Sequence, residues 1–220
     1  MTKLVIFDLD GTLLDTRADI ADACNYALRM CGCPERKLEE YNMLVGRGIL
    51  NLFRGALPEG RKDEETVLKM KEHFVPYYNA HIDNLTRPYD GIMEMLDAIV
   101  REGIHLAIAS NKYQEGTETL VRKYFGAYDF VCILGQREGK PIKPDPEIIH
   151  EAMESLPGTT AAEVMYCGDS DVDMQTGINA GVRTIGITWG FRTREELMSY
   201  SPWILAENAE DIIKAITEEN

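Results

Sequence analysis

The sequence predicts an α/β fold in which a parallel sheet carries an inserted helical domain. From residue 90 onward, short apolar runs alternate with amphipathic helical patterns, and this alternation is typical of a parallel sheet with right-handed crossovers. Residues 17–82, in contrast, show helical patterns only. With 220 residues, 45% of them apolar, the chain can bury one ordinary core and a smaller second one.

The first strand is expected over residues 3–7, because this short, branched and apolar run is typical of a buried parallel strand. Helices are expected over 17–31, 48–57 and 62–80, and Thr16 and Asp19 are spaced for a capping box at the first of them. The chain is then expected to continue as helix 91–102, strand 104–109, helix 114–125, strand 129–134, helix 146–155, strand 163–167, helix 172–180 and strand 182–187. Asp145-Pro146, Gly181 and the pair Asn208 and Asp211 mark helix ends, the last pair opening a final helix.

The helical insertion is expected to form a domain of its own. It is about 65 residues long, whereas a usual connection has about 4–6 residues. We call residues 16–82 the cap, and residues 1–15 together with 83–220 the core. The two connections, near 13–16 and 82–89, predict a hinge, and a hinged cap over a sheet edge can admit a substrate and then exclude water. The alternative is a rigid insertion that does not move.

Composition argues against two classes of partner. The formal net charge is −14 and no basic block is present, so neither nucleic acid nor an anionic membrane surface is an expected partner. The first apolar run is short and stops at Asp8, and no stretch is long enough for a membrane span, which predicts a cytoplasmic protein. The five cysteines form no Cys-x-x-Cys pair and are expected to be reduced thiols.

The segment Asp8-Leu9-Asp10-Gly11-Thr12 follows the first strand directly. In open α/β sheets, ligands bind at the carboxyl edge where such a strand ends. Burying two carboxylates so close together costs several kcal/mol unless a cation or a proton relieves the repulsion. The segment therefore indicates a metal-dependent enzyme that acts on phosphate, while the alternative is an ordinary acidic turn.

Two further segments are suited to holding phosphate oxygens. Ser110 and Asn111 follow the strand 104–109, and a hydroxyl, an amide and free backbone N–H groups at a strand end can cradle a phosphate. Ser-Asn is also a common helix cap, which is the alternative. Lys143 lies in a loop stiffened by Pro141 and Pro144, which reduces the entropy lost when its ammonium is held in place.

A third segment, residues 168–173, places three acids after the strand 163–167. Asp169, at the strand exit, can complete the oxygen shell of a hard cation with Asp8, and Mg²⁺ prefers such sparse carboxylate sites. Asp171 and Asp173 can instead cap the following helix, where the dipole favours acids.

Taken together and in this order, the segments resemble the four motifs of the haloacid dehalogenase superfamily of phosphotransferases. The matching residues are Asp8 to Thr12, Ser110-Asn111, Lys143-Pro144 and Gly168 to Asp173. Residues 8–16 and 143–146 look most like the phosphoglycolate phosphatase branch. The resemblance covers essentially the whole chain and implies a Rossmann-like, doubly wound parallel sheet with an inserted α-helical cap of the C1 type.

The resemblance also implies a role for each motif residue. Asp8 is the nucleophile that forms an aspartyl-phosphate, and Asp10 protonates the leaving oxygen and then activates water. Ser110 and Lys143 hold the transferring oxygens, and Gly11, Thr12 and Asn111 belong to the same substrate-binding set. The implied cofactor is Mg²⁺, held by Asp8, Asp10 through its backbone carbonyl, and Asp169, with Asp173 orienting a metal-bound water or the lysine.

The cap is expected to choose the substrate, and Arg47 between Gly46 and Gly48 is its candidate residue. A guanidinium on a flexible loop can clamp a carboxylate or a second phosphate; the alternative is a solvated loop charge. The expected activity is hydrolysis of a small phosphate monoester of the phosphoglycolate kind, by a monomer or homodimer. A β-phosphoglucomutase-like phosphomutase, a pyrophosphatase or nucleotidase, and a binding module without turnover are the alternatives.

Overall fold

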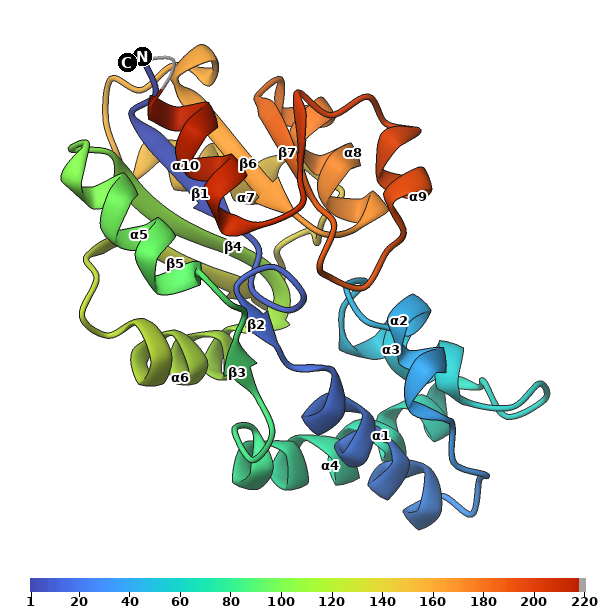
Figure 1. Ribbon diagram of the computed structural model, residues 1–220. Coiled ribbons are helices and arrows are strands. Elements are labelled where there is room, and N and C mark those ends of the chain that lie inside the picture. Colours follow the sequence, from blue (N-terminus) through green and yellow to red (C-terminus); the bar gives the residue numbers. More distant parts are fainter. Residues whose placement is uncertain (218–220) are drawn as a thin grey trace.

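A six-stranded parallel sheet forms the centre of the protein (Figure 1). The computed structural model describes residues 1–217. The order across the sheet is β5-β4-β1-β6-β7-β8, with β1 Leu4–Phe7, β4 His105–Tyr113, β5 Phe130–Gln136, β6 Val164–Gly168, β7 Arg183–Ile187 and β8 Ile204–Ala206. The α/β fold class expected from the alternating pattern is confirmed.

The first strand, β1, lies in the middle of the sheet because it is apolar on both faces. Leu4 pairs with His105 of β4 on one side and with Val164 of β6 on the other. All four residues of β1 are fully buried, as expected of a central parallel strand. The strand order reverses at β1, and ligands bind at the carboxyl edge beside such a reversal.

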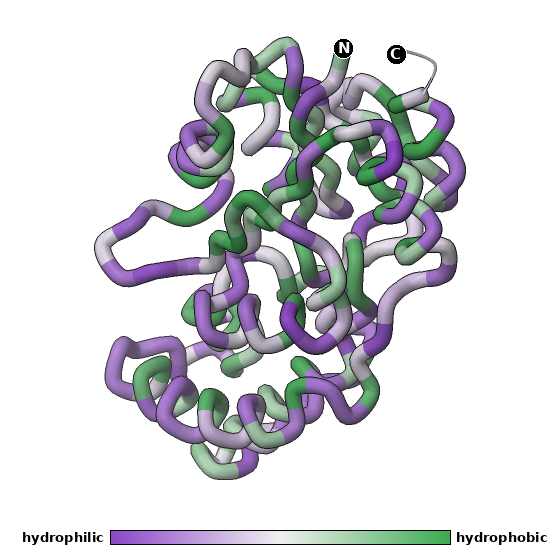
Figure 2. Tube along the Cα trace, turned by 90° about the vertical axis from the view of Figure 1, so that its left-hand side faces the viewer, coloured by the Kyte–Doolittle hydropathy of each residue, from purple (hydrophilic) through white to green (hydrophobic). Residues whose placement is uncertain are grey.

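Helices cover both faces of the sheet (Figure 1). One face packs against α5 Ile92–Arg101, α6 Gln114–Phe125 and α10 Ala209–Thr217, and the other against α7 Glu147–Glu154 and α8 Asp171–Ala180. The two apolar clusters divide alternate residues of β1 between them, with Val5 and Phe7 in one and Leu4 and Ile6 in the other. Figure 2 shows the hydrophobic segments inside this layered region and hydrophilic segments at its periphery.

The cap residues form helices that lie beyond the carboxyl edge of the sheet (Figure 1). They are α1 Arg17–Met30, the short 3₁₀ helix η1 Leu38–Glu40, α2 Tyr41–Leu44, α3 Ile49–Ala56 and α4 Glu64–His81. Helices α1 and α4 pack side by side, with the rings of Tyr26 and Tyr77 stacked 4.1 Å apart. A two-stranded antiparallel pair, β2 Leu14–Asp15 and β3 Arg87–Pro88, joins the cap to the core. That this segment folds as a separate domain on a hinge stays a prediction.

Several local features differ from the expectations. The capping box at the start of α1 was wrong, because Thr16 makes no side-chain cap hydrogen bond. Asp19 instead accepts from the backbone N–H groups of Leu85 and Thr86 and from the Thr86 hydroxyl, at 2.8–3.0 Å, and so ties α1 to the second connection. The strand β4 also runs to Tyr113, four residues beyond its expected end.

The remaining short elements had no counterpart in the expected order. They are η1, α2, β2, β3, β8, the 3₁₀ helix η2 Ala161–Glu163 and the helix α9 Arg194–Met198. Two predicted helix ends are confirmed: Gly181 ends α8 in the left-handed conformation, and Asp211 and Asn208 hydrogen-bond to each other at the start of α10. Within the described part of the chain, no helix has the length and apolar character needed to cross a membrane.

Candidate active site

Asp8 and Asp10 leave the sheet at its centre, where β1 ends. The Asp8 N–H donates to the carbonyl of Cys167 at 2.9 Å, which continues the pairing with β6. Gly11 follows with φ +89°, and a Cβ at this position would lie 2.3 Å from Asp169 Oδ2. Only glycine fits here, both because φ is positive and because the Asp169 carboxylate occupies the space that a Cβ would need. The loop thus places Asp8 and Asp10 near Asp169, the acid that follows β6.

Lys143 is the cation of this cluster, and it is almost fully buried. Its Nζ lies 3.0 Å from Asp8 Oδ1 and 2.7 Å from Asp173 Oδ1. It also donates to the Tyr166 hydroxyl at 2.8 Å and to the Ala109 carbonyl at 3.0 Å. Burial lowers the pKa of Lys143, but the two carboxylates outweigh it and raise the pKa above its ordinary value. The ammonium is therefore charged and held at one place beside Asp8.

Asp173 is the acid that Lys143 neutralises most directly. Burial alone raises its pKa, but Lys143, together with hydrogen bonds from Ser170 and Tyr166, lowers it below the ordinary value. The Ser170 hydroxyl and N–H both donate to Asp173 Oδ2, at 2.5 and 3.1 Å, at the start of α8. Asp173 is consequently an ionised group that fixes the lysine and caps the helix.

Asp8, Asp169 and Asp173 bring carboxylate oxygens within 4.8 Å of one another, all of them buried. Burial raises the pKa of Asp8 to about 6, with Asp173 and Asp10 adding to the rise and Lys143 and Ser110 opposing it. Burial, followed by Asp173 and Asp8, also raises the pKa of Asp169 well above its usual range. The single positive charge of Lys143 therefore does not balance the three carboxyl groups of the cluster.

The same cluster fits a hard divalent cation. Asp8 Oδ1 is buried and has no hydrogen-bond donor in acceptable geometry, although Lys143 Nζ is near it. Asp169 accepts from Phe191 N at 2.7 Å and from the Thr12 hydroxyl at 3.3 Å, which orients its carboxylate toward the cluster. Sparse carboxylate oxygens with room for water are the ligands that Mg²⁺ prefers, so the residues present fit the expected metal.

Asp10 lies outside the cluster and faces the cap. Both its oxygens accept from Lys112 Nζ at 3.1 Å, and the same ammonium donates to the Tyr78 hydroxyl of α4 at 2.7 Å. Burial, with Asp10 adding to it, raises the pKa of Tyr78 well above its usual range. The phenol is therefore neutral, and the Lys112 side chain lies between an acid of the core and a hydroxyl of the cap.

Ser110 and Asn111 lie in the last part of β4 and are buried. The Ser110 hydroxyl accepts from the N–H of Lys112 at 3.3 Å, and its interaction with Asp8 lowers the pKa of that carboxyl. The Asn111 amide donates to the carbonyls of Gly46 and Lys143 and accepts from Lys143 N, at 2.9–3.1 Å. Asn111 thereby connects the lysine loop to the cap loop, while Ser110 stays next to Asp8.

Arg47 lies apart from these residues. Its side chain is about half exposed and forms an ion pair with Asp171 at the start of α8, and it does not line the cavity described below. Arg192, buried between cap and core, binds the same Asp171 at 3.3 Å and donates to the carbonyls of Asn42, Met43 and Val45 in the cap. A contact of Arg47 with substrate stays a prediction.

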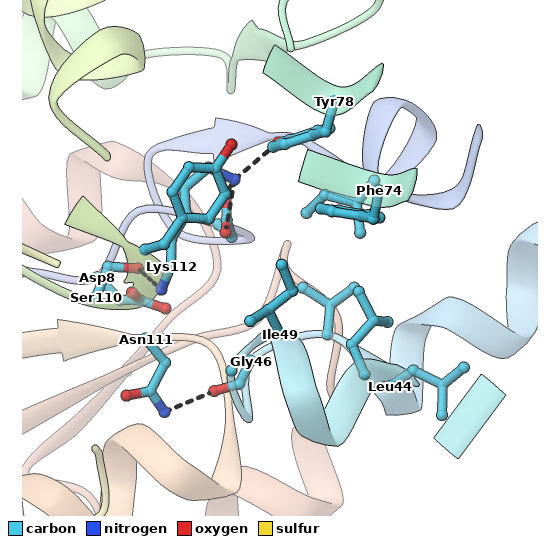
Figure 3. Close-up of a pocket in the computed structure, with 15 residues that line it drawn as sticks. Asp8, Leu44, Gly46, Ile49, Phe74, Tyr78, Ser110, Asn111 and Lys112 are labelled. Carbon is cyan, nitrogen blue, oxygen red and sulfur yellow. Dashed lines mark hydrogen bonds and ion pairs between the residues drawn. The ribbon is translucent and has the colours of Figure 1, made fainter. Parts of the chain in front are cut away.

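A cavity of about 50 Å³ separates the sheet edge from the cap. Figure 3 shows Asp8, Ser110, Asn111 and Lys112 on its core side and Leu44, Ile49, Phe74 and Tyr78 on its cap side. Since a water molecule needs about 10–15 Å³ by this measure, the space holds a ligand of only a few non-hydrogen atoms beside the acids.

The structure therefore brings most of the predicted residues together. The residues that gather at this edge are Asp8, Asp10, Gly11, Thr12, Ser110, Asn111, Lys143, Asp169 and Asp173. Lys112, Tyr166 and Arg192 were not among the predicted residues. Only Lys112 left a signal, since it follows Ser110-Asn111 directly and lies two residues beyond Ser110, on the same side of an extended strand.

Comparisons with known proteins agree with this geometry. Residues 5–187 match the family described as haloacid dehalogenase-like hydrolase. A phosphoglycolate phosphatase of Agrobacterium fabrum is 31% identical over 220 residues, covering 99% of this chain and 94% of that protein. A crystal structure from Lactobacillus delbrueckii, whose protein is provisionally named phosphoglycolate phosphatase, is 30% identical with a TM-score of 0.89, covering 98% and 99% of the two chains. A predicted phosphatase from Clostridium acetobutylicum is 27% identical with a TM-score of 0.88, covering 99% of both.

Proposed function

Since the chain belongs to the haloacid dehalogenase-like hydrolase family, we propose that it is a Mg²⁺-dependent phosphatase that hydrolyses a small phosphate monoester of the phosphoglycolate class. The observation that carries the proposal is the buried Asp8 with Lys143 Nζ 3.0 Å from one oxygen and Asp169 and Asp173 beside it. Many relatives with the name phosphoglycolate phosphatase support the choice of substrate class.

The proposed reaction has two steps, and each moves one proton. A carboxylate oxygen of Asp8 attacks phosphorus, the bond from phosphorus to the ester oxygen breaks, and Asp10 gives its proton to the departing oxygen. In the second step, Asp10 takes a proton from water, the resulting hydroxide attacks phosphorus, and Asp8 is released with inorganic phosphate. A carboxylate nucleophile needs no base, and a second carboxyl two positions away can carry the proton.

The surrounding residues stabilise the charge that this chemistry moves. The Lys143 ammonium and the Ser110 hydroxyl lie next to Asp8, so both can hold the oxygens of the transferring phosphoryl group. At the same end of the site, Gly11 and the Thr12 hydroxyl lie against the Asp169 carboxylate. The Asn111 amide holds the backbone of Lys143. Asp8, Asp169 and the Asp10 carbonyl would hold Mg²⁺, with Asp173 behind them, and the ion would supply positive charge that screens the repulsion between nucleophile and phosphate.

The cavity favours a short leaving group. The cavity of about 50 Å³ that Asp8 and Asp10 line is small, which supports a two-carbon acid over a sugar or a nucleoside. We also propose a cytoplasmic location, which the five free cysteines of the chain support, because reduced thiols are typical of that compartment.

The test is phosphate release from a panel of phosphorylated small acids, sugar phosphates, nucleotides and pyrophosphate, with Mg²⁺ and again with a chelator. We expect release from small acids, dependent on Mg²⁺, and none from Asp8→Asn, which keeps the shape of the side chain but cannot act as the nucleophile. Release that persists in Asp8→Asn contradicts the aspartyl-phosphate. Isomerisation of a sugar 1-phosphate without net release of phosphate favours the phosphomutase instead.

A further inference from the structure

We propose that Lys112 selects the substrate, by binding a carboxylate carried on the leaving group of the phosphate ester. This inference rests on the proposed phosphatase function and adds to it the group that recognises the rest of the substrate. Lys112 was not assigned a role by sequence, and Arg47 was the candidate for this task.

The first support is the composition of the cavity wall. On the cap side, the wall is apolar, formed by Ile20, Leu44, Ile49, Leu52 and Phe74. A carboxylate placed against these side chains without a partner costs several kcal/mol. Among the described residues that line the cavity, Lys112 is the one cation. An anionic leaving group therefore has a single ammonium available to it within the cavity.

The second support is the position of that ammonium relative to Asp10. Lys112 Nζ is 3.1 Å from both Asp10 oxygens, and the acid that protonates a leaving oxygen must lie about 2.6–3.2 Å from it. The leaving oxygen and the ammonium are thus both neighbours of one carboxyl group. A carboxylate one carbon away from the leaving oxygen can reach Lys112 while the oxygen itself contacts Asp10.

The third support is the environment of the ammonium. The Lys112 side chain is 4% exposed, whereas the Arg47 side chain is 49% exposed. Ion pairs that are open to solvent contribute little, while buried charge-assisted hydrogen bonds are strong and directional. The Tyr78 hydroxyl accepts from Lys112 at 2.7 Å and carries no charge, so on the cap side of the ammonium no anion of the described residues faces it. A second oxygen of the substrate carboxylate can take the proton of the same hydroxyl.

The test compares two substrates that differ only in this charge. Phosphoglycolate carries a carboxylate on the carbon next to the ester oxygen, and 2-hydroxyethyl phosphate carries an uncharged CH₂OH group there. The quantity measured is the ratio of kcat/KM for the two substrates, because a general loss of catalysis through Asp10 lowers both values and leaves the ratio unchanged. We expect the unmodified enzyme to prefer phosphoglycolate by about 10- to 100-fold, as for one hydrogen-bonded charge pair.

The variant Lys112→Met keeps an unbranched side chain only one atom shorter and removes its charge. We expect its ratio to fall to within about threefold of unity, while Lys3→Met, a matched change at the opposite end of the sheet, keeps the full ratio. Arg47→Met tests the earlier candidate and is expected to keep the preference. If Lys112→Met does not fold, Lys112→Gln provides the same measurement.

A binding experiment gives a readout that does not depend on turnover. In the background of Asp8→Asn, phosphoglycolate with Mg²⁺ is titrated into the protein with and without Lys112→Met, and the affinity is expected to fall about 10- to 100-fold. A ratio that survives in Lys112→Met, or one that collapses in Arg47→Met, overturns the inference and leaves the phosphatase standing. An unmodified enzyme that hydrolyses both substrates equally well also overturns the inference about Lys112 and leaves the phosphatase function standing. An enzyme that hydrolyses neither overturns the proposed function and this inference together.

Discussion

Replacing Gly11 with alanine tests how closely the first acidic loop must pack on Asp169. Gly11 has φ +89°, and an added Cβ would lie 2.3 Å from Asp169 Oδ2 and 2.7 Å from its Cγ. Gly139 is a matched control, since its φ is +75° but no heavy atom lies within 4 Å of the added Cβ. Both changes carry the backbone strain of alanine at positive φ, about 1–2 kcal/mol. Only Gly11→Ala must also move a buried carboxylate.

The magnitude of the second effect follows from the partners of Asp169. Displacing it weakens the hydrogen bond from Phe191 N at 2.7 Å and the longer one from the Thr12 hydroxyl, and a buried donor left without its acceptor costs about 1–3 kcal/mol. We therefore expect Gly11→Ala to lower the free energy of unfolding by about 2–5 kcal/mol, against about 1–2 kcal/mol for Gly139→Ala.

Two measurements check this reasoning. Urea unfolding gives the free energy of unfolding of each variant, compared at the same slope m against urea concentration. The Mg²⁺ concentration at half-maximal activity reports on the metal site. We expect that concentration to rise at least about tenfold in Gly11→Ala, because a loss of about 1.4 kcal/mol corresponds to a factor of ten, and to stay unchanged in Gly139→Ala. If the two variants behave alike in both measurements, the close packing of Gly11 on Asp169 does not govern the site.

Three further predictions concern the rest of the chain. The ion pair with Lys3, with hydrogen bonds from Thr160, lowers the pKa of Glu163 from 4.5 to about 2. The ionised Glu163 therefore stabilises the fold fully above pH 4.5, and this stabilisation is lost as the pH falls toward 2. We expect the free energy of unfolding, measured above and below pH 4.5, to depend less on pH in Glu163→Gln. Arg192→Met removes a buried cation that donates to cap carbonyls, and we expect a raised KM and faster limited proteolysis of the cap. Asp19→Asn weakens the bonds to the second connection and should cost about 1–3 kcal/mol in thermal unfolding, with an unchanged Mg²⁺ requirement.

The succession of the main helices and strands along the chain and the acidic motifs could be predicted because their signals are local. Leu4–Phe7 is a continuous apolar run, and Asp8 follows it directly, so parallel pairing alone brings it to the edge where β6 ends. Ser170 and Asp173 likewise form a capping box within four residues of one another. In each case, the residue types that determine the structure are neighbours in sequence.

Other features could not be predicted because distant residues determine them. β4 continues through Ser110, Asn111 and Lys112 although these residues are polar, since the core and the cap provide partners for their side chains. The spacing of Thr16 and Asp19 fits a capping box, but Asp19 finds stronger donors about 66 residues away, where two backbone N–H groups converge on it. The position of Arg192 among cap carbonyls depends wholly on how the cap is placed.

The central place of β1 in the sheet has a consequence for the synthesis of the protein. A chain grows from its N-terminus at about 5–20 residues per second, and Asp8 is made early, whereas Lys143 and Asp173 come far later. The helices of the cap make contacts that are local in sequence and can form while translation continues. The apolar strand β1 remains unpaired until its neighbours β4 and then β6 have been synthesised. An unpaired apolar strand is prone to aggregation. A chain that has not yet reached α8 lacks Asp173, and therefore cannot assemble the buried cluster of Asp8, Lys143 and Asp173.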